Sequence, residues 1–481
     1  MDVLLINPKN IKSQVHDIMP PLGLVSIGCV LEKNGFSVSI LDLELRPLDF
    51  DLNTYIRNLS PKVVGISGTS HSRFESFRIA DITKQVSDKI ITVYGGCHAT
   101  FTAEDTLTHI KSIDYVVHGE GEATFLELVK FIKSGNGTAD TIAGISFRRN
   151  NKAIHNPPRD RILDLDSIPY SRHLLEMDKY DVRLDFLNVP ATSFITSRGC
   201  PYNCSFCSAS AMFGTTYTMR SAINIVAEIE YCIEKFNIKG FKFFDSTLTA
   251  SKKHITSLIE ELKARKINLP WECEIRVNTV DKPLLEAMKG VGCYYVNFGV
   301  ESVSERVLKT MGKGITIQQI TDVMKWCKEL DIKTKVFFSF GHIDETLDDS
   351  KKTFAFIDKH INYITHLSVA LGVRVYPGTR VENHARENRL LPKDFSWSEP
   401  FKDIDEYPIA TDNVPLLLQP SYGYGIKELK KCYYRLYKTE LKRDIKGLKS
   451  VIGKLKNIKS FSDLSQKVSR IFRWVISEFR S

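Results

Sequence analysis

The chain has 481 residues, enough for two or three domains with complete hydrophobic cores, and its apolar (43%) and charged (26%) fractions are ordinary. No stretch approaches the ~20 uncharged apolar residues that span a bilayer, and the opening MDVLLINPKN has no basic lead or cleavage site, so we expect neither a membrane-spanning helix nor a signal peptide. The net charge of +9 comes from residues 426–481, which hold 16 Lys and Arg against 5 Asp and Glu, so an anionic partner is expected only at that tail.

Residues 1–140 alternate strand-like runs with helical stretches. The runs VLLIN, SVSILD, VVGIS and ITVYGG are rich in branched apolar residues, and the stretches LGLVSIGCVLEKNG and FESFRIADITKQVSD between them are helical in pattern. This alternation predicts an α/β domain with a doubly wound, Rossmann-like parallel sheet. Ligands of such sheets lie beyond the carboxyl ends of the strands, where this chain has the loops GTSHSR (68–73), GGCHAT (95–100) and HGEGEAT (118–124).

Residues 141–190 contain several prolines and little periodicity, and we interpret them as a linker. A second strand–helix series follows in residues 191–395. Its strand candidates are SFITS (193–197), GFKFFD (240–245), WECEIRV (271–277), YYVNFGV (294–300), KVFFSF (335–340) and THLSVALGVRV (365–375). Six strand–helix units predict a partial (β/α)6 barrel, whose chemistry lies at the carboxyl ends of its strands.

Residues 396–481 are expected to form a basic helical C-terminal region. Near its end one helical face carries Val468, Ile471, Phe472, Val475, Ile476 and Phe479, and Lys and Arg crowd the other faces around Trp474. Two interpretations stay open: a helix lying in a membrane interface, or a helix that packs on the barrel with its charges solvated. Nucleic acid ranks last, because the tail has no obvious stacking platform.

Three cysteines, Cys200, Cys204 and Cys207, follow the first barrel strand at a spacing of three and then two residues. Thiolates at this spacing can hold three irons of a 4Fe–4S cube and leave the fourth iron open. An amino-carboxylate such as the methionine part of S-adenosylmethionine (SAM) could chelate that iron, and an electron from the cluster could then cleave the sulfonium. The alternative is a zinc site completed by a distant His or Cys. The other seven cysteines read as small buried apolar side chains of a protein in the reducing cytoplasm.

The segment TSRGCPYNCSFC resembles the radical SAM superfamily, whose signature is C-x-x-x-C-x-aromatic-C, with Phe206 at the aromatic position. The resemblance implies a 4Fe–4S cluster, SAM and an external electron donor of the flavodoxin or ferredoxin type. It also implies SAM contacts from the motifs FFDST, WECEIRVN and FGVESVSERVLKTMGKGIT. The expected SAM-binding residues are Phe206, Asp245, Arg276, Asn278, Glu301 and Ser302. One departure is FGHIDET (340–346), where the family often has a proline-containing turn, so no adenine contact is assigned there.

A doubly wound domain ahead of this barrel resembles the cobalamin-binding subclass of radical SAM enzymes. The motifs PPLGL (20–24), GGCHAT and HGEGE carry that likeness, which covers residues 1–395. It implies cobalamin bound by the three loops, with contacts from Thr69, Ser70, His71, Gly95, Gly96, His98, Gly119, Glu120 and Gly121. The alternative is a domain that has kept the fold and lost the corrinoid.

The lower face of the cobalt is expected to lack the usual histidine. Many corrinoid proteins supply it from an Asp-x-His-x-x-Gly motif, which is absent here, and VHDIMP around His16 is not that motif. His71 is the one exception that we consider, although a lone loop histidine is more often a hydrogen-bonded surface group. His98 is expected to support the corrin-binding loop.

The resemblance implies that a 5′-deoxyadenosyl radical takes hydrogen from an unactivated carbon, that methylcobalamin donates a methyl group, and that a second SAM regenerates it. We expect a C-methyltransferase for a small molecule or lipid-like substrate in the cytoplasm, peripheral to the membrane if the tail binds it. Three alternatives stay open: cyclisation or rearrangement without net methylation, RNA methylthiolation, and a non-enzymatic cofactor carrier. Methylthiolation is disfavoured because the first 190 residues have only Cys29 and Cys97 for the second cluster of that family.

Overall fold

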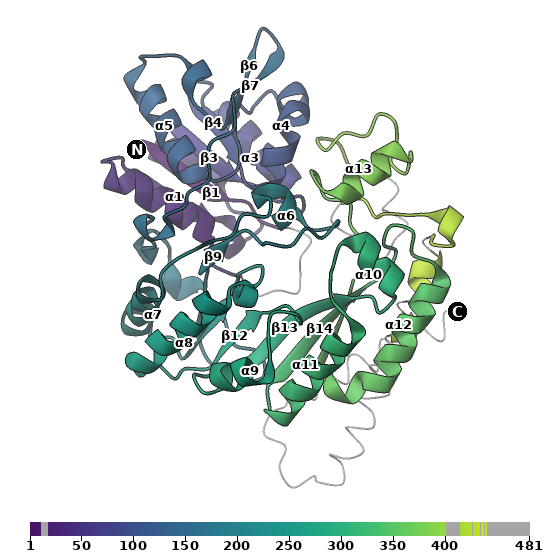
Figure 1. The fold of residues 1–481 in the computed structure, drawn as a ribbon. Coiled ribbons are helices and arrows are strands. Elements are labelled where there is room, and N and C mark those ends of the chain that lie inside the picture. Colours follow the sequence, from purple (N-terminus) through teal and green to yellow (C-terminus); the bar gives the residue numbers. More distant parts are fainter. Residues whose placement is uncertain are drawn as a thin grey trace.

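The computed structural model describes residues 1–10, 18–370, 372–400, 414–425, 427–432, 434–436 and 438–439. A sheet with helices on both faces is formed by the N-terminal third, and a second sheet with an outer layer of helices lies beneath it (Figure 1). His16 and the basic helices expected beyond residue 440 lie outside the described residues.

The first sheet has seven strands in the order β2-β1-β3-β4-β5-β6-β7. Its five parallel strands are β1 (Val3–Asn7), β2 (Val38–Asp42), β3 (Val63–Ser67), β4 (Ile91–Gly95) and β5 (Tyr115–Val117). The connecting helices are α1 (Leu22–Lys33), α2 (Leu52–Leu59), α3 (Arg73–Val86), α4 (Cys97–His109) and α5 (Gly121–Ser134). The reversal of strand order at β1 and β3 is that of a doubly wound fold, as predicted.

Alternating apolar residues explain why this sheet is covered on both faces. In β1, Val3 and Leu5 pack with the apolar residues of α1 and α5, whereas Leu4 and Ile6 pack with those of α2, α3 and α4. A strand buried on both faces reads as a continuous apolar run, which is the pattern of VLLIN and VVGIS.

The linker predicted for residues 141–190 begins differently from our expectation. Strands β6 (Ile145–Arg149) and β7 (Lys152–His155) form an antiparallel hairpin that extends the first sheet. Asn150 and Asn151 turn the chain with φ of 50° and 61°, and asparagine is a residue type that tolerates such turns. The charged sequence RRNNK concealed the hairpin, so the N-terminal domain extends beyond residue 140.

The second sheet is the predicted six-stranded partial barrel. All of its strands are parallel, in the order β15-β14-β13-β12-β11-β8. They are β8 (Ala191–Phe194), β11 (Gly240–Phe243), β12 (Trp271–Glu274), β13 (Cys293–Glu301), β14 (Lys333–Ser339) and β15 (His366–Ala370). The six predicted strands are therefore confirmed.

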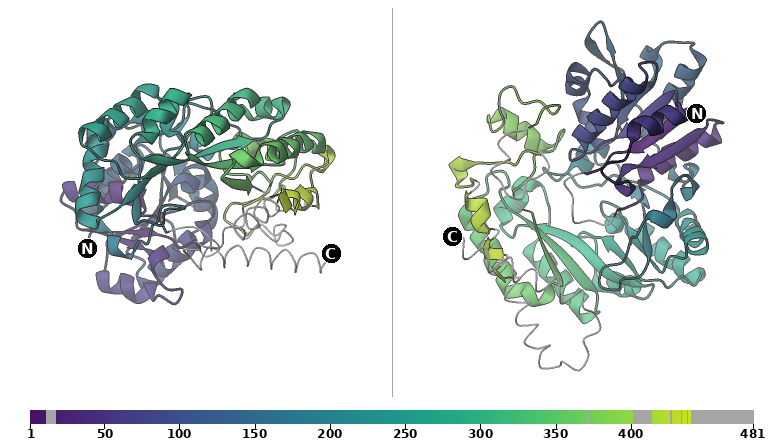
Figure 2. Two further views of the ribbon diagram at one scale, coloured as in Figure 1. Left: turned by 90° about the horizontal axis from the view of Figure 1, so that it is seen from below. Right: turned by 180° about the vertical axis from the view of Figure 1, so that it is seen from behind.

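Helices cover the convex side of this barrel as an arc around the strands (Figure 2). They are α7 (Ala222–Phe236), α8 (Lys252–Ala264), α9 (Lys282–Lys289), α10 (Glu305–Met311), α11 (Ile317–Glu329) and α12 (Leu347–His360). The largest apolar cluster of the described residues lies between these helices and the strands, with Trp271, Phe241 and Phe298 buried at its centre. The concave side is polar, and there Lys242 pairs with Glu272 at 3.1 Å.

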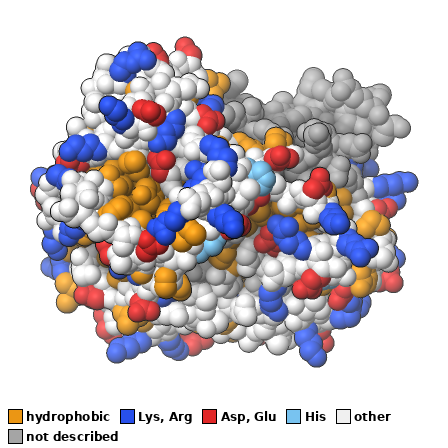
Figure 3. All heavy atoms as spheres, turned by 90° about the horizontal axis from the view of Figure 1, so that it is seen from above, with side chains coloured by type: hydrophobic (Ala, Val, Ile, Leu, Met, Phe, Trp, Pro, Cys, Tyr) orange, Lys and Arg blue, Asp and Glu red, His pale blue; other side chains and the backbone are white. Residues whose placement is uncertain are grey.

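The chain returns towards the first domain after the sixth strand. Helix α13 (Arg380–Glu387) and the segment that follows it lie beside the N-terminal layer (Figure 1). Acidic and basic side chains are interspersed on the upper face of the molecule (Figure 3). Among the described residues, we find no helix with the length and apolarity required to cross a bilayer.

Candidate functional site

The cysteine loop lies between the two domains. It leaves β8, forms the short strand β9 (Ser197–Arg198), which pairs with β10 (Thr218–Met219), and ends in α6 (Ser208–Phe213). Two backbone hydrogen bonds hold the loop from below: Ser205 N donates to Met311 O at 2.8 Å, and Val381 N donates to Ser205 O at 3.2 Å. The barrel therefore supports the loop at its carboxyl-terminal mouth, as predicted.

The three thiols neighbour one another. Burial raises the pKa of the Cys200 thiol, and the charges of Cys207 and Cys204 raise it further. Among the described residues, no three His, Cys, Asp or Glu side chains lie close enough together to bind one metal ion. An iron–sulfur cluster fits the loop because of its ligand chemistry: one short loop supplies three thiols, and a cation and a hydroxyl lie beside them.

That cation is Arg276, which follows β12. Its Nη1 lies 3.7 Å from Cys204 Sγ, and its guanidinium stacks 3.9 Å above the Tyr202 ring. The Nε of Arg276 and the Oδ1 of Asn278 are buried and have no hydrogen-bond partner among the described residues. Unpaired buried polar atoms are rare in native proteins unless a ligand or water completes them. The pair thus fits the polar end of a zwitterionic ligand beside the cysteines.

Asp245 follows the second barrel strand, β11, and lies against the start of the cysteine loop. Its carboxylate accepts hydrogen bonds from the backbone and hydroxyl of Thr196 (3.1 and 2.8 Å) and from the Ser197 hydroxyl. Burial raises the pKa of Asp245 to about 6. These bonds hold the start of the cysteine loop, and the expected contact of Asp245 with SAM remains a prediction. The nearby Thr247 hydroxyl, which our sequence analysis missed, lies 3.9 Å from Cys200 Sγ.

Glu301 belongs to a buried polar cluster from three elements. Lys313 Nζ pairs with Glu301 Oε1 at 3.0 Å, and the Ser339 hydroxyl donates to Glu301 Oε2 at 2.8 Å. Ser339 also bonds to His342 Nε2 at 2.7 Å, and the His342 ring lies edge-on to Phe206, with 5.5 Å between centroids. Burial lowers the pKa of His342 to about 4. Lys313 belongs to the motif GKGIT, and His342 belongs to FGHIDET, the loop that differs from the family pattern. Their separation in the sequence did not indicate that the two side chains meet.

Ser302 does not join this cluster. Its hydroxyl lies within bonding distance of Thr353 Oγ1 (3.3 Å) on α12, accepts a bond from Ser304 N (3.2 Å), and is fully buried. These bonds hold Ser302 against α12, and its expected contact with SAM remains a prediction.

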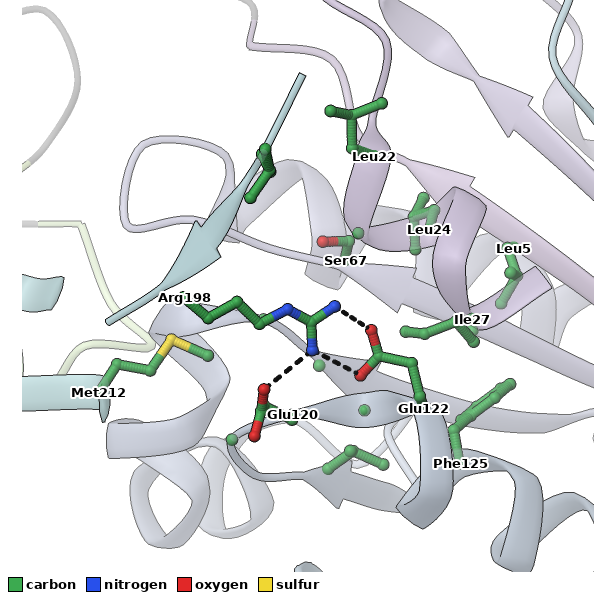
Figure 4. A pocket seen from close by; sticks show the side chains of 18 of the residues that line it. Leu5, Leu22, Leu24, Ile27, Ser67, Glu120, Glu122, Phe125, Arg198 and Met212 are labelled. Carbon is green, nitrogen blue, oxygen red and sulfur yellow. Dashed lines mark hydrogen bonds and ion pairs between the residues drawn. The ribbon is translucent and has the colours of Figure 1, made fainter. Parts of the chain in front are cut away.

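A cavity of about 300 Å³ opens between the glycine loops and the cysteine loop. Its walls are mainly apolar, and both domains contribute to them (Figure 4). Of the expected cobalamin contacts, Gly95, Gly96, Gly119, Glu120 and Gly121 line it, together with Arg198, Gly199, Met212, Phe244 and Ser246 from the barrel. At Gly96, φ is 102° and an added Cβ would lie 2.7 Å from the carbonyl oxygen of Gly68, so only glycine fits this part of the wall.

Two carboxylates of the HGEGE motif face Arg198 across this cavity wall (Figure 4). Arg198 Nη1 lies 2.9 Å from Glu120 Oε1, and its Nη2 lies 2.6 Å from Glu122 Oε1. Glu120 also pairs with Arg161 Nε at 2.9 Å. The Glu120 carboxylate therefore pairs with two arginines of the protein, and its expected contact with cobalamin remains a prediction.

Four other expected cobalamin contacts, Thr69, Ser70, His71 and His98, are not among the residues that line this cavity. His71 Nε2 bonds to the Tyr376 hydroxyl at 3.0 Å, which links the first domain to the barrel. His98 is 1% exposed, and its Nδ1 bonds to the Ser70 hydroxyl at 2.9 Å. His98 thus connects the loop at 95–100 to the loop at 68–73, as expected of a residue that supports the corrin-binding loop.

Comparison with known proteins identifies both domains. The Radical SAM superfamily model matches residues 194–357, which include all three cysteines, and the B12 binding domain model matches residues 9–129. An uncharacterised methyltransferase of Pyrococcus horikoshii is 34% identical, with 93% of this chain and 98% of that protein aligned. The anaerobic magnesium-protoporphyrin IX monomethyl ester cyclase of Rubrivivax gelatinosus is 29% identical over 74% of this chain and 65% of its own length.

A solved structure shares the arrangement of the two domains. The radical SAM methyltransferase TsrM of Kitasatospora setae, with cobalamin and a 4Fe–4S cluster bound, is 24% identical and superposes with a TM-score of 0.69 over 81% of this chain and 78% of its own. At this identity the likeness concerns the fold. The zinc alternative and the non-enzymatic carrier find no support, and a 4Fe–4S cluster, SAM and cobalamin are the cofactors. The chain belongs to the cobalamin-binding family of radical SAM enzymes.

Proposed function

We propose that the protein is a C-methyltransferase that methylates an unactivated carbon of a small molecule. One observation carries the proposal: the glycine loops and the cysteine loop line a single cavity. When bound, the cluster and SAM supply a carbon radical that removes hydrogen from the substrate, and cobalamin supplies the methyl group. The name of the Pyrococcus relative, which aligns over nearly its whole length, also supports methyl transfer.

The residues have separate tasks in this proposal. Cys200, Cys204 and Cys207 hold the cluster, and Arg276 and Asn278 offer buried, unpaired polar atoms to the zwitterionic end of SAM. Glu301, held by Lys313 and Ser339, is proposed to bind a ribose or methionine group, and Lys313 Nζ lies 5.7 Å from the centroid of the Phe206 ring. The proposal needs no proton transfer by any of these side chains, because the cofactors perform the bond cleavage.

The cavity walls keep the reacting carbon away from water. Glycines 95, 96, 119 and 121 admit a large planar ligand from the side of the first domain. Phe244, which follows β11, remains 45% exposed and lines the barrel side together with Met212. An apolar lining around few polar groups suits a site that must orient cofactors and protect a radical.

Methyl-labelled SAM tests the proposal. The anaerobically reconstituted holoenzyme is incubated with a strong reductant, cobalamin, labelled SAM and an extract of small molecules from the cells that make the protein. We expect 5′-deoxyadenosine together with label in a carbon-methylated product. The variant Cys204→Ala should give neither, because it cannot hold the cluster. Label that stays out of every product while 5′-deoxyadenosine accumulates contradicts methyl transfer.

The same experiment separates a second candidate, cyclisation or rearrangement without net methylation. The similarity to the cyclase of Rubrivivax gelatinosus favours it, since that protein shares 29% identity over 74% of this chain. Its outcome would be a new product without label that forms in proportion to 5′-deoxyadenosine.

Two partners complete the proposal. A flavodoxin- or ferredoxin-type protein is expected to deliver the electron, and reduction of the cluster by such a protein, followed by EPR, tests it. Any membrane contact belongs to the basic tail at 426–481, most of which lies outside the described residues. The full chain should then sediment with vesicles of anionic lipids and not with neutral ones, and equal sedimentation with both would contradict an electrostatic anchor.

A further inference from the structure

The ion pairs around Arg198 connect the two cofactor loops directly. Arg198 belongs to β9 and precedes the first cysteine of the cluster motif by two residues. Its guanidinium reaches three carboxylate oxygens: Glu120 Oε1 at 2.9 Å, Glu122 Oε1 at 2.6 Å and Glu122 Oε2 at 3.3 Å. Glu120 and Glu122 flank Gly121 in the loop that lines the cavity from the first domain.

The surroundings make this connection stiff. The side chains of Arg198, Glu120 and Glu122 are 13%, 6% and 6% exposed. Further bonds hold the two carboxylates: Glu122 accepts from the Ser26 hydroxyl at 2.7 Å, and Glu120 accepts from Ile162 N at 2.8 Å. With Arg161, the group contains two cations and two anions and is fully paired.

Buried ion pairs of this kind give little net stability, because desolvation offsets their attraction. Their best-attested use is to fix one arrangement among several. Burial alone would raise the pKa of Glu122, and the Arg198 guanidinium outweighs that effect, so the pKa is lowered and the pair stays ionised. A planar guanidinium that bonds to two carboxylates also fixes their relative orientation, which an ammonium group does not.

We infer that Arg198 is a positioning residue that couples the cobalamin loop to the cluster loop, so that occupation of one cofactor site changes affinity at the other. The inference rests on the proposed function, because it assumes that the cavity takes a corrinoid. Coupling between two sites is reciprocal, and typical factors lie between about 5- and 150-fold. Without the Arg198 guanidinium, both cofactor sites should remain, and the affinity of one should no longer depend on occupation of the other.

Binding of hydroxocobalamin to the full chain tests the inference, measured by absorbance with and without a reconstituted cluster. In the natural protein we expect the two Kd values to differ on the order of tenfold. In Arg198→Lys, which keeps the charge, and Glu122→Gln, which keeps the shape, the ratio should fall below about twofold. The EPR spectrum of the reduced cluster should respond to cobalamin in the natural protein and not in either variant.

Arg172→Lys is the matched control. Arg172 forms a buried ion pair of the same kind with Glu228 at 2.9 Å, and it does not line the cavity. A comparable loss of stability there should leave the tenfold ratio intact. The inference is overturned if both variants keep the ratio, or if Arg172→Lys loses it equally. If the natural protein binds no cobalamin at all, the proposed function fails as well, so the two failures can be told apart.

Discussion

A positive charge lies directly beside one of the cysteines. Arg276 Nη1 lies 3.7 Å from Cys204 Sγ and stacks on Tyr202, so its position is well defined. Net charge and hydrogen bonds to sulfur are main determinants of the reduction potential of an iron–sulfur cluster. A nearby cation stabilises the reduced form, which carries one more negative charge.

Replacing Arg276 by Met should therefore make the cluster harder to reduce. We expect the midpoint potential to become more negative by roughly 60 mV, which for one electron is a tenfold change in the equilibrium constant. An EPR-monitored redox titration of the reconstituted protein measures it. Arg265→Met, at the exposed end of α8, removes a charge elsewhere and should leave the potential unchanged. An unaltered or more positive potential in Arg276→Met would show that this charge does not act on the cluster.

His342 makes folding stability dependent on pH. Burial lowers its pKa to about 4 from an unfolded value near 6.5. Between these pH values the unfolded chain binds more protons than the native one, so stability falls as pH decreases through this window. From pH 7.5 to 5.5 the loss from this residue is roughly 1 kcal/mol.

His342→Gln should flatten that dependence. Denaturant unfolding at pH 7.5 and 5.5 should show a drop smaller by roughly 1 kcal/mol than in the natural protein. The baseline stability at pH 7.5 will also decrease, because the bond to Ser339 changes, so the comparison concerns the difference between the two pH values. His109→Gln, on an exposed side chain of α4, is the control. A full-sized drop in His342→Gln would assign the effect to other groups, of which the buried His254 is the first.

At the same scale, sequence reasoning reached residues that belong to recognisable motifs. It found the cysteines and the strand-end position of Arg276. It could not find that Glu301, Lys313, Ser339 and His342 meet, because three elements far apart in the chain bring them together. It gave Asp245 and Glu120 as ligands, and it could not show that both carboxylates also bond to neighbouring protein groups. A motif identifies a residue type at a place and does not show which partner the side chain chooses.

At the scale of elements, the cysteine loop depends on one glycine. Gly199 has φ of 88°, and a Cβ there would overlap with the carbonyl oxygen of Thr216, next to β10. Gly199→Ala should separate β9 from β10 and displace Cys200. We expect iron and sulfide content after reconstitution to fall several-fold.

Gly214→Ala provides a matched comparison for Gly199→Ala. Gly214 also has positive φ, 61°, but nothing lies within 4 Å of the position of its Cβ. Its substitution carries the cost of the left-handed backbone alone, about 1 kcal/mol, and should keep the cluster. Equal iron content in both variants would mean that the crowding at Gly199 is unimportant.

The elements themselves were largely predictable, because apolar periodicity and length are local properties. The six barrel strands and the first four strands of the doubly wound sheet were found. The short β5 and the hairpin of β6 and β7 were missed, since three residues carry too little pattern and charged side chains on an edge strand conceal it. Both elements form because they pair with neighbouring strands of the sheet. That pairing is a tertiary contact, which the local sequence does not reveal.

At the scale of the whole molecule, Trp397 fastens the end of the barrel to the first domain. It is 3% exposed, its ring lies edge-on to His98 with 5.5 Å between centroids, and its carbonyl accepts a bond from Arg73 Nε at 2.8 Å. Its indole Nε1 donates to Glu382 on α13 at 2.9 Å. The hydroxyls of Ser396 and Ser398 both donate to Asp105 on α4, at 2.7 Å. The cavity between the domains therefore depends on contacts made by residues 396–398.

Trp397→Ala should loosen this junction and weaken cobalamin binding, although Trp397 does not line the cavity. Removing a buried tryptophan costs about 3–5 kcal/mol, and the loss falls on the contact between the domains rather than on either core. We expect the Kd of the full chain for hydroxocobalamin to rise at least tenfold, because each domain supplies only one wall of the site, while iron uptake by the barrel persists. Trp326→Ala, on α11 at the outer face of the barrel core, is the control for a lost tryptophan and should lower stability without changing that Kd. If Trp397→Ala binds cobalamin as tightly as the natural protein, the first domain alone holds the corrinoid, and the junction serves stability only.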